Sequence, residues 1–408
     1  MKHLYTIALR LALPLILLRL WWRSRREPGY LEGIEERFGF YSGSRLEKVV
    51  WVHAVSVGEA RAAAPLVRAL KEALPDHAVV MTGTTAAGRE TIKQVHGESV
   101  IPTFLPYDYP ESVRAFLERF RPTLGILMET EIWPNLLAAC TTYGVPVVLA
   151  NARMSEKSAR GYRRWRSLMA PAIRSLAAVC AQSEADAARL RALGAPRVEV
   201  TGNLKFDVTL DAAQLAAGRE WKAKVGRPVL LLASSREGEE KLLLSELPMG
   251  HSFLTLVVPR HPQRFDEVAQ LADARRSRNE TPKSIYLGDT MGEMAFYYGA
   301  ADVAVIGGSF LPLGGQNLIE ALAAGVPVIV GPSMFNFAEA TRLALEAGAA
   351  VQVADAQAAL RIAVELLGDK GKREEMGRAG TKLCAAHRGA TLKHLKVLKA
   401  AALTAKRD

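Results

Sequence analysis

Short apolar runs alternate with amphipathic segments along most of this chain. The runs hold about four or five residues, many of them β-branched, which is the pattern of strands buried on both faces of a sheet. The first set lies at residues 49–53, 78–81, 124–128, 145–149, 178–181 and 198–201. The second set lies at residues 228–232, 254–258, 284–287, 303–306 and 327–330. The alternation predicts an α/β chain with two Rossmann-like, doubly wound domains that face each other across a cleft.

The first 28 residues depart from this alternation. The run from Leu4 to Trp22 is almost wholly apolar, and a helix of that length spans roughly 28 Å, about the hydrocarbon core of a bilayer. Its end has the pattern of a cytoplasmic membrane boundary, with Trp21, Trp22, Arg23, Arg25 and Arg26. We therefore expect residues 1–28 to form a membrane anchor. Arg10 costs about 2.5–3.5 kcal/mol in a full span, so the segment is compatible with a single span, with an interfacial helix and with a helix packed on the protein body.

Length and charge narrow the interpretation. The chain has 408 residues, which suits two domains, and a net charge of +11, which favours anionic partners. Nucleic acid fits least among these partners, because the sequence has neither zinc-finger spacing nor a glycine-aromatic RNA-binding motif. We place the first domain at residues 29–206, a connection at 207–226, and the second domain with the C-terminal helix at 227–408.

A glycine-rich segment in the second half carries much of the chemical information. Residues 307–317 follow the strand at 303–306, and a helix begins near Leu318. Glycines let backbone N–H groups approach a ligand, and the positive end of a helix dipole favours an anion. Glu320 lies in the first turn, where its carboxylate can reach sugar hydroxyls. The arrangement resembles the nucleotide-sugar half of GT-B glycosyltransferases.

Ionisable residues follow predicted strands of the first domain. Glu59 stands where a helix begins, either as a carboxylate favoured by the helix dipole or as a general base that the same dipole keeps ionised. Glu129 and Glu131 follow the strand at 124–128, where carboxylates suit an oxocarbenium-like transition state, a neighbouring cation or a metal ion. Lys205 is either a surface lysine or a group that holds a carboxylate or a phosphate.

Two loops of the second domain complete the candidates. Arg260 follows the strand at 254–258, and an arginine at a strand end is a natural phosphate clamp. Gly292 and Glu293 open a helix that can cap a base or a ribose. Ligands of parallel sheets bind at the carboxyl ends of the strands, so both loops are placed for ligand binding.

The chain carries, in order, the motifs H-A-V-S-V-G-E, L-P-Y-D, M-E-T-E-I-W-P-N, N-A-R-M-S, T-G-N-L-K-F-D, P-R-H-P-Q-R, G-D-T-M-G-E-M and G-G-S-F-L-P-L-G-G-Q-N. Together they resemble the 3-deoxy-D-manno-octulosonic acid (Kdo) transferases of Gram-negative bacteria, from the N-terminal segment to about Ala349. The resemblance implies a GT-B fold and transfer of Kdo from CMP-Kdo to the lipid A precursor, with inversion, on the cytoplasmic face of the bacterial inner membrane. It also implies that neither a metal nor a cofactor takes part.

The resemblance assigns roles motif by motif. Glu59 matches the catalytic base, and Glu129 and Lys205 match the groups that stabilise the transition state. The residues that match the CMP-contacting segments are Pro259, Arg260, Met291, Gly292, Glu293, Asn317, Leu318, Ile319 and Glu320. This chain has Gln316 where the family usually has His, and Gln263 where it usually has Glu. The first difference lies in the nucleotide loop, and neither removes a proposed catalytic group.

The expected partners are CMP-Kdo, the lipid A precursor and lipid of the inner membrane, without an obligate protein partner. Two other functions are compatible with parts of the pattern: another membrane-associated GT-B transferase with a different nucleotide sugar, and a lipid A-binding protein without catalysis. The N-terminal segment argues against a soluble sugar epimerase. The intact candidates Glu59, Glu129, Lys205 and Arg260 argue against a protein without catalysis.

Overall fold

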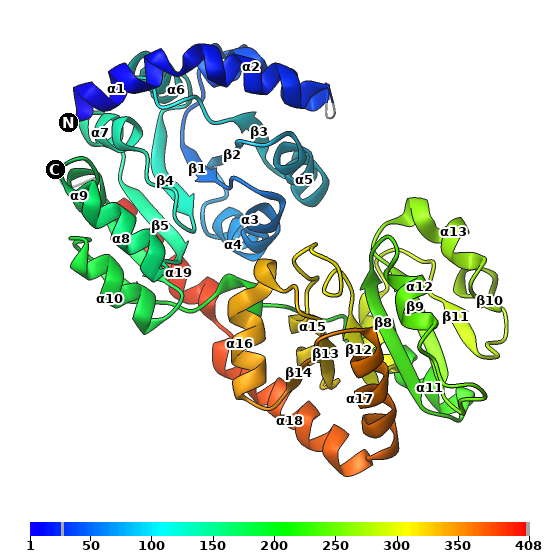
Figure 1. Cartoon of the computed structure of the whole chain (residues 1–408). Helices are drawn as coiled ribbons and strands as arrows, with labels where there is room; N and C mark the ends of the chain where they lie inside the picture. Colours follow the sequence, from blue (N-terminus) through cyan, green and yellow to red (C-terminus); the bar gives the residue numbers. More distant parts are fainter. Residues whose placement is uncertain (26–27, 405–408) are drawn as a thin grey trace. The chain divides into compact units, whose positions relative to one another are not determined.

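The computed structural model describes residues 1–25 and 28–404, and Arg26 of the expected membrane boundary lies outside them. The chain divides into two compact units (Figure 1). The first unit holds Met1–Asp207 and Gly389–Asp408, and the second holds Val208–Arg388. Each unit is built on its own parallel sheet, so the expected α/β class with two Rossmann-like domains is confirmed.

The first unit is built around a seven-stranded sheet in the order β3-β2-β1-β4-β5-β6-β7. Its strands are β1 (Val49–His53), β2 (Ala78–Gly83), β3 (Ile101–Phe104), β4 (Pro122–Met128), β5 (Val147–Ala152), β6 (Ala178–Ala181) and β7 (Val198–Val200). Its α-helices are α1 (Lys2–Leu11), α2 (Leu13–Ser24), α3 (Val57–Ala62), α4 (Ala64–Ala73), α5 (Ala86–His96), α6 (Pro110–Phe120), α7 (Pro134–Thr142), α8 (Glu156–Arg164), α9 (Arg166–Arg174), α10 (Glu184–Ala192) and α19 (Ala390–Thr404). All of β1 is buried, as its continuous apolar run predicts.

Successive residues of β1 point into two different hydrophobic cores. Trp51 joins the first core, where its ring meets Phe116 of α6 edge-on at 5.1 Å between ring centroids. Val50 and Val52 join the second core together with Leu398 of α19. Helices distant in sequence therefore cover this sheet on both faces, and the last helix supplies part of the second core.

The second unit repeats the architecture with the strand order β10-β11-β9-β8-β12-β13-β14. Its strands are β8 (Val229–Ser235), β9 (Leu254–Pro259), β10 (Ala274–Arg275), β11 (Ile285–Leu287), β12 (Val303–Ile306), β13 (Val328–Val330) and β14 (Ala350–Gln352). Its α-helices are α11 (Ala212–Val225), α12 (Glu239–Leu244), α13 (Phe265–Ala269), α14 (Met294–Ala300), α15 (Ile319–Ala323), α16 (Ala338–Glu346), α17 (Ala356–Gly368) and α18 (Lys370–His387). The strand pairs are parallel throughout, in keeping with the βαβ pattern.

Two boundaries differ from those expected from the sequence. Residues 207–226 are not a mere connection, because most of them form α11, which packs on α14 within the second unit. The two helices approach so closely at Gly218 that a Cβ there would lie 2.1 Å from the carbonyl oxygen of Phe296. The C-terminal helix α19, expected in the second domain, belongs to the first unit, where Asp207 accepts a hydrogen bond of 2.7 Å from Gly389 N.

A buried histidine fastens α19 to the first sheet. His394 Nδ1 lies 2.7 Å from the carbonyl oxygen of Ala390, which only accepts, so Nδ1 carries the proton. Nε2 is then free to accept, and it receives the backbone N–H of Asn151 at 2.9 Å. Burial lowers the pKa of His394 to about 4, so the imidazole is neutral at physiological pH.

The N-terminal apolar segment forms two helices where one was expected. α1 ends at Leu11 and α2 begins at Leu13, with Pro14 in its first turn, and the pair is bent by 50°. Among the described residues, no single helix is long and apolar enough to cross a membrane, although this bent pair passes the test of length and composition together. The expected membrane-anchor helix is therefore not confirmed.

Polar contacts join α1 to the body of the first unit. Asn135 Nδ2 donates to the hydroxyl oxygen of Thr6 at 3.0 Å, and Asn135 is buried at the start of α7. Arg10, the residue that disfavours a full span, forms an ion pair of 3.1 Å with Glu111 of α6. α1 is thus a helix packed on the protein body, which is one of the alternatives that the sequence left open.

Replacing His394 with glutamine should change how stability depends on pH. The folded imidazole has a pKa of about 4 while an unfolded one titrates near 6.5, so protonation of the unfolded chain lowers the free energy of unfolding as the pH falls through that window. Glutamine keeps an acceptor for Asn151 N and does not titrate. In urea unfolding curves, the free energy of unfolding of His394→Gln minus that of wild type should therefore be roughly 2 kcal/mol larger at pH 4.5 than at pH 7. If the free energies of unfolding of the variant and of wild type differed by the same amount at every pH, the lowered pKa of His394 would be contradicted.

Candidate active site

The loops that carry Glu59 and Glu129 follow neighbouring strands of the first sheet. β1 and β4 lie side by side where the strand order reverses, with β2 and β3 on one side and β5 to β7 on the other. In open parallel sheets, ligands bind beyond the carboxyl ends of the strands at such a switch point. Both carboxylates therefore lie where this fold commonly forms a site.

Glu59 takes part in a capping arrangement at the first turn of α3. Ser56 is the N-cap residue, and its hydroxyl oxygen accepts from Glu59 N at 3.3 Å while the hydroxyl donates to Glu59 Oε1 at 2.9 Å. Glu59 Oε2 accepts from Val55 N at 2.9 Å. Glu59 lies in the first turn of α3, as both interpretations of this residue expected, and these bonds give its side chain a defined orientation.

The surroundings of Glu59 raise its pKa. The residue is only 8% exposed, and burial, followed by the negative charge of Glu129, raises the pKa to about 7 against the opposing hydrogen bonds from Val55 and Ser56. The expectation that the helix dipole keeps this carboxylate ionised is therefore wrong in direction, because desolvation outweighs the favourable interactions. A carboxylate that titrates near neutral pH is well matched to accept a proton in a reaction at that pH.

Glu129 occupies a left-handed backbone conformation at the end of β4, with φ 57°. Its N–H donates to the carbonyl oxygen of Ala150 at 2.9 Å, and its carboxylate lies 3.9 Å from Lys205 Nζ. Lys205 is thus the neighbouring cation that the sequence analysis considered for Glu129. Glu131 accepts a hydrogen bond of 3.0 Å from Trp133 Nε1, and burial followed by the charge of Glu129 raises its pKa.

A buried polar network positions the loop of Lys205. Asn203 Oδ1 accepts from Lys205 N at 3.0 Å, and Asn151 Oδ1 accepts from Leu204 N at 3.0 Å. Asn151, the next-to-last residue of β5, has a left-handed conformation with φ 51°, and its N–H donates to His394. A chain of hydrogen bonds therefore runs from α19 to the loop that presents the candidate lysine.

The candidates for CMP contact lie beyond the carboxyl ends of strands in the second sheet. Pro259 is the last residue of β9 and Arg260 follows it, residues 291–293 follow β11, and residues 317–320 follow β12. The strand order places β8 between β9 and β12, so the loop after β8 belongs to the same edge. The structure therefore gathers the three predicted segments at one edge of one sheet.

Positive charge is concentrated at this edge. The pKa of His261 is lowered by burial and then by the charges of Arg236 and Arg260. Arg260 N also donates to the carbonyl oxygen of Ser235 at the end of β8, at 2.9 Å. A group of cations beyond strand ends is suited to an anionic ligand. Arg236 was missed in the sequence, where no pattern distinguished it from other loop arginines.

The glycine-rich loop is held from within the protein. The buried carboxylate of Glu239, at the start of α12, accepts from Gly308 N and, at 3.0 Å, from Phe310 N. Gly314 N donates to the hydroxyl oxygen of Ser333 at 3.0 Å. The expected phosphate cradle is therefore wrong for these three N–H groups, because an internal carboxylate and a hydroxyl already occupy them.

The start of α15 is capped by a neighbouring amide. Asn317 Oδ1 accepts from Ile319 N at 3.0 Å, and Asn317 Nδ2 donates to Glu320 Oε1 at 2.9 Å. The side chains of Leu318 and Ile319 are fully buried. Neither residue, backbone included, is exposed in this structure, whereas Glu320 is partly exposed and oriented by Asn317.

Glu293 is paired with an arginine that the sequence analysis missed. Arg276 donates to both oxygens of Glu293 at 3.1 Å, and its guanidinium lies over the ring of Phe296, 3.7 Å from the centroid. Arg276 follows the two-residue strand β10, which is too short to show a periodic pattern. Met291 is 62% exposed and Gly292 has φ 76°, so this turn presents open backbone and an apolar side chain.

Two family models match the chain, one in each half. Residues 32–208 match the model described as "3-Deoxy-D-manno-octulosonic-acid transferase (kdotransferase)". Residues 265–383 match the model described as "Glycosyl transferases group 1". The first match covers Glu59, Glu129 and Lys205, and the second covers the CMP-contact candidates after β11 and β12.

Relatives match over almost the whole length. The chain is 47% identical to a 3-deoxy-D-manno-octulosonic acid transferase of Bordetella pertussis, over 98% of this chain and 99% of the relative. It is 36% identical to that of Haemophilus influenzae, over 98% of both chains. A UDP-GlcNAc 2-epimerase from Neisseria meningitidis aligns with a TM-score of 0.56 at 17% identity, over 86% of this chain and 99% of its own. A glycosyltransferase from Rickettsia africae aligns with a TM-score of 0.55 at 15% identity, over 88% and 99%, and these two show a shared GT-B-like fold.

The raised pKa of Glu59 has a measurable thermodynamic consequence. A carboxylate whose folded pKa is about 7 favours folding at low pH, and this contribution is lost as the pH rises through 7. Glu59→Gln keeps the hydrogen-bonding shape without a charge, so the variant should exceed wild type by about 1–3 kcal/mol in free energy of unfolding at pH 8. The difference should shrink toward pH 4.5 in chemical unfolding curves. A variant less stable than wild type at both pH values would show that the capping bonds, not the buried charge, dominate.

Proposed function

The chain belongs to the family of 3-deoxy-D-manno-octulosonic acid (Kdo) transferases, and we propose that it transfers Kdo from CMP-Kdo to a hydroxyl group of the lipid A precursor, with inversion, in lipopolysaccharide core biosynthesis. The observation that carries this proposal is the 47% identity to a Kdo transferase over almost the whole of both chains. The carboxylates at the switch point of the first sheet and the cations at the edge of the second supply chemistry that fits the reaction.

The proposed base is Glu59. As the acceptor hydroxyl oxygen bonds to the anomeric carbon of Kdo, its proton passes to the Glu59 carboxylate. The bond between that carbon and the phosphate oxygen breaks, and its electron pair leaves with CMP. The pKa of about 7 supports this role, because a base works best when its pKa lies near the working pH.

Glu129 and Lys205 are the proposed stabilisers of the transition state. A carboxylate favours the positive charge that develops on the sugar ring, and an ammonium favours the anionic groups of the donor. Their separation of 3.9 Å leaves each within reach of the other without a tight ion pair. Lys205 therefore lies beside Glu129 in the free enzyme. Because this ion pair is loose, moving its two side chains apart when the donor binds costs little free energy.

The proposed CMP site uses side chains more than loop amides. Arg260 would hold the phosphate, and Glu320, oriented by Asn317, would bind a ribose hydroxyl. The other proposed contact residues are Pro259, Met291, Gly292, Glu293, Leu318 and Ile319. Metal-independent binding is part of the proposal, since the cations of this edge, Arg236 and Arg260, supply positive charge for the phosphate.

We further propose that α1 and α2 attach the protein to the inner membrane from its cytoplasmic side, as an interfacial surface. Six large apolar side chains are each more than half exposed: Leu4, Ile7, Leu11, Leu15, Leu18 and Trp22. Their spacing of three or four residues forms one row along the two helices, on a different face from Thr6 and Arg10, through which α1 contacts the protein body. Such an exposed apolar row beside arginines is typical of a helix that lies in the headgroup region.

The transfer reaction tests the proposed function directly. Purified wild type, incubated with CMP-Kdo and the lipid A precursor, should yield a glycolipid heavier by Kdo in mass spectra. Glu59→Gln should fold and bind CMP normally but lose about 10²–10⁴-fold in turnover, because a positioned base contributes about that much. Glu72→Gln, on the exposed face of α4, is the matched control and should be fully active. Near-normal turnover of Glu59→Gln would assign the base elsewhere, with Glu129 or Glu131 next.

The apolar row predicts which substitutions release the protein from membranes. Leu11→Gln, Leu15→Gln and Leu18→Gln together should reduce binding to lipid vesicles by roughly tenfold or more, because three leucines lose their apolar burial in lipid. The melting temperature should stay unchanged, since all three side chains are exposed. Leu392→Gln with Leu403→Gln, two exposed leucines of α19, is the control. Equal vesicle binding by the triple variant and wild type would refute the interfacial surface.

A further inference from the structure

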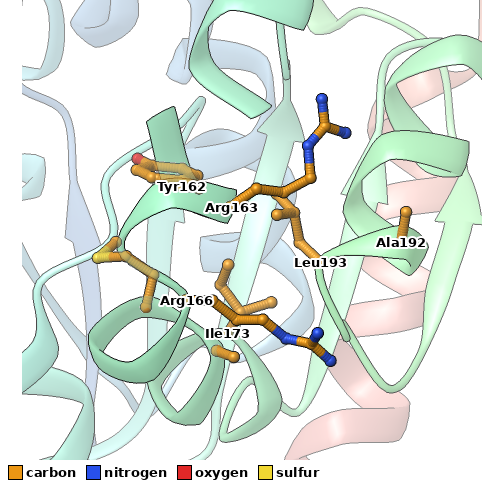
Figure 2. Close-up of a pocket in the computed structure, with 8 residues that line it drawn as sticks. Tyr162, Arg163, Arg166, Ile173, Ala192 and Leu193 are labelled. Atoms are coloured by element: carbon orange, nitrogen blue, oxygen red, sulfur yellow. The ribbon is translucent and has the colours of Figure 1, made fainter. Parts of the chain in front are cut away.

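A pocket that the proposed reaction does not use lies among α8, α9 and the end of α10 (Figure 2). Its volume is about 120 Å³. The residues that line it are Tyr162, Arg163, Arg166, Met169, Ala170, Ile173, Ala192 and Leu193. The floor is apolar and well packed, because Met169, Ala170, Ile173 and Leu193 are each less than a tenth exposed.

Two arginines stand on the rim of this pocket. Figure 2 shows Arg163 and Arg166 on opposite sides, with the apolar floor between their side chains. Arg163 forms an ion pair of 2.9 Å with Glu156, but both side chains are about half exposed, so the pair is weak and exchangeable. Arg166 forms no ion pair with any described residue. The rim therefore offers one arginine without an ion pair among the described residues and a second in an exposed, exchangeable pair.

The helix pair around the pocket is basic and has an exposed aromatic ring. Residues 153–166 contain six arginines and lysines against one acidic residue, Glu156. Trp165, between α8 and α9, is 55% exposed. Arginines beside an apolar floor and an exposed tryptophan match a ligand with both an anionic group and an apolar part, and they disfavour a neutral sugar or a purely apolar ligand.

One residue of the pocket wall also contacts the candidate active site. The hydroxyl of Tyr162 donates to the carbonyl oxygen of Thr130 at 3.2 Å, within the loop that carries Glu129 and Glu131. The charge of Glu131 contributes, after burial, to the raised pKa of Tyr162. A molecule held in the pocket therefore lies against the same side chain that supports the loop of Glu129, one of the two proposed transition-state stabilisers.

We propose that this pocket binds a phosphate group of the phosphorylated glycolipid acceptor. Arg163 and Arg166 hold the phosphate oxygens, and the apolar floor receives carbon atoms of the same lipid. The inference rests on the proposed function, because that function supplies a phosphorylated acceptor. It adds a binding site for that acceptor on α8 and α9, outside the motifs that carry the family resemblance in Glu59, Glu129 and Lys205.

Direct binding tests the pocket independently of turnover. The probes are the bisphosphorylated lipid A precursor and the same lipid after phosphatase treatment, each titrated calorimetrically in neutral detergent micelles. The double variant Arg163→Gln with Arg166→Gln should bind the phosphorylated lipid about tenfold or more weakly, and should bind the dephosphorylated lipid as wild type does. Ala192→Trp, at an exposed position of the rim, should obstruct the floor and weaken both. Arg219→Gln, an exposed arginine of α11, should change neither.

The outcomes separate the pocket from the proposed function. Unchanged affinity of the double variant for the phosphorylated lipid, with normal melting curves, would overturn the pocket assignment. So would normal micelle binding together with lost pelleting on phosphatidylglycerol vesicles, which would assign the arginines to membrane phospholipid. Turnover measured on the same samples tests the proposed function. Wild type that binds the lipid but transfers no Kdo would contradict that function, and the binding data of the variants would still decide whether the pocket binds the lipid.

Discussion

The hydrogen bond from the backbone of Asn151 to the buried imidazole of His394 joins three parts of the first unit. It fastens the last helix to the end of β5, and the Asn151 side chain continues the connection to Leu204, next to Lys205. A buried N–H without an acceptor is costly. In the left-handed conformation of Asn151 its N–H is directed at the imidazole, which supplies the acceptor. The geometry of the candidate lysine thus depends on a residue almost two hundred positions away.

The candidate site concentrates negative charge where water is scarce. The charge of Glu129 adds to burial in raising the pKa of Glu59 and the pKa of Glu131, and Lys205 Nζ lies 3.9 Å from the Glu129 carboxylate. The capping bonds from Ser56 and Val55 keep Glu59 in place although burial opposes its ionised form. This combination of a fixed orientation and a raised pKa is common where a carboxylate exchanges protons with a ligand, and it sets the site apart from the exposed ion pairs of the same unit.

The sequence was sufficient for most strands and for the loops that follow them, because buried parallel strands are continuous apolar runs with clear ends. It missed the short strands β3, β10 and β14. It was insufficient wherever a partner distant in sequence decides the outcome. The pKa of Glu59 depends on burial and on Glu129, which no local pattern reveals. Gly308 N is occupied by Glu239, and the three carboxylates Glu237, Glu239 and Glu240 after β8 were a signal that could have been used. The assignment of α19 to the first unit depends on its apolar residues, which pack into a core whose other members lie hundreds of positions earlier in the sequence.

The placement of α19 also bears on the order in which the protein acquires its structure during synthesis. The second unit is continuous, from Val208 to Arg388, whereas the first needs residues from both before and after it. Domains usually fold as their residues emerge from the ribosome, beginning with the N-terminal one. Here the β5 end and the second core of the first unit stay incomplete until Val397 and Leu398 have emerged. The unit that is synthesised first is therefore the last to complete its fold. Until then part of its second core is exposed, and this apolar surface is what a ribosome-associated chaperone would bind.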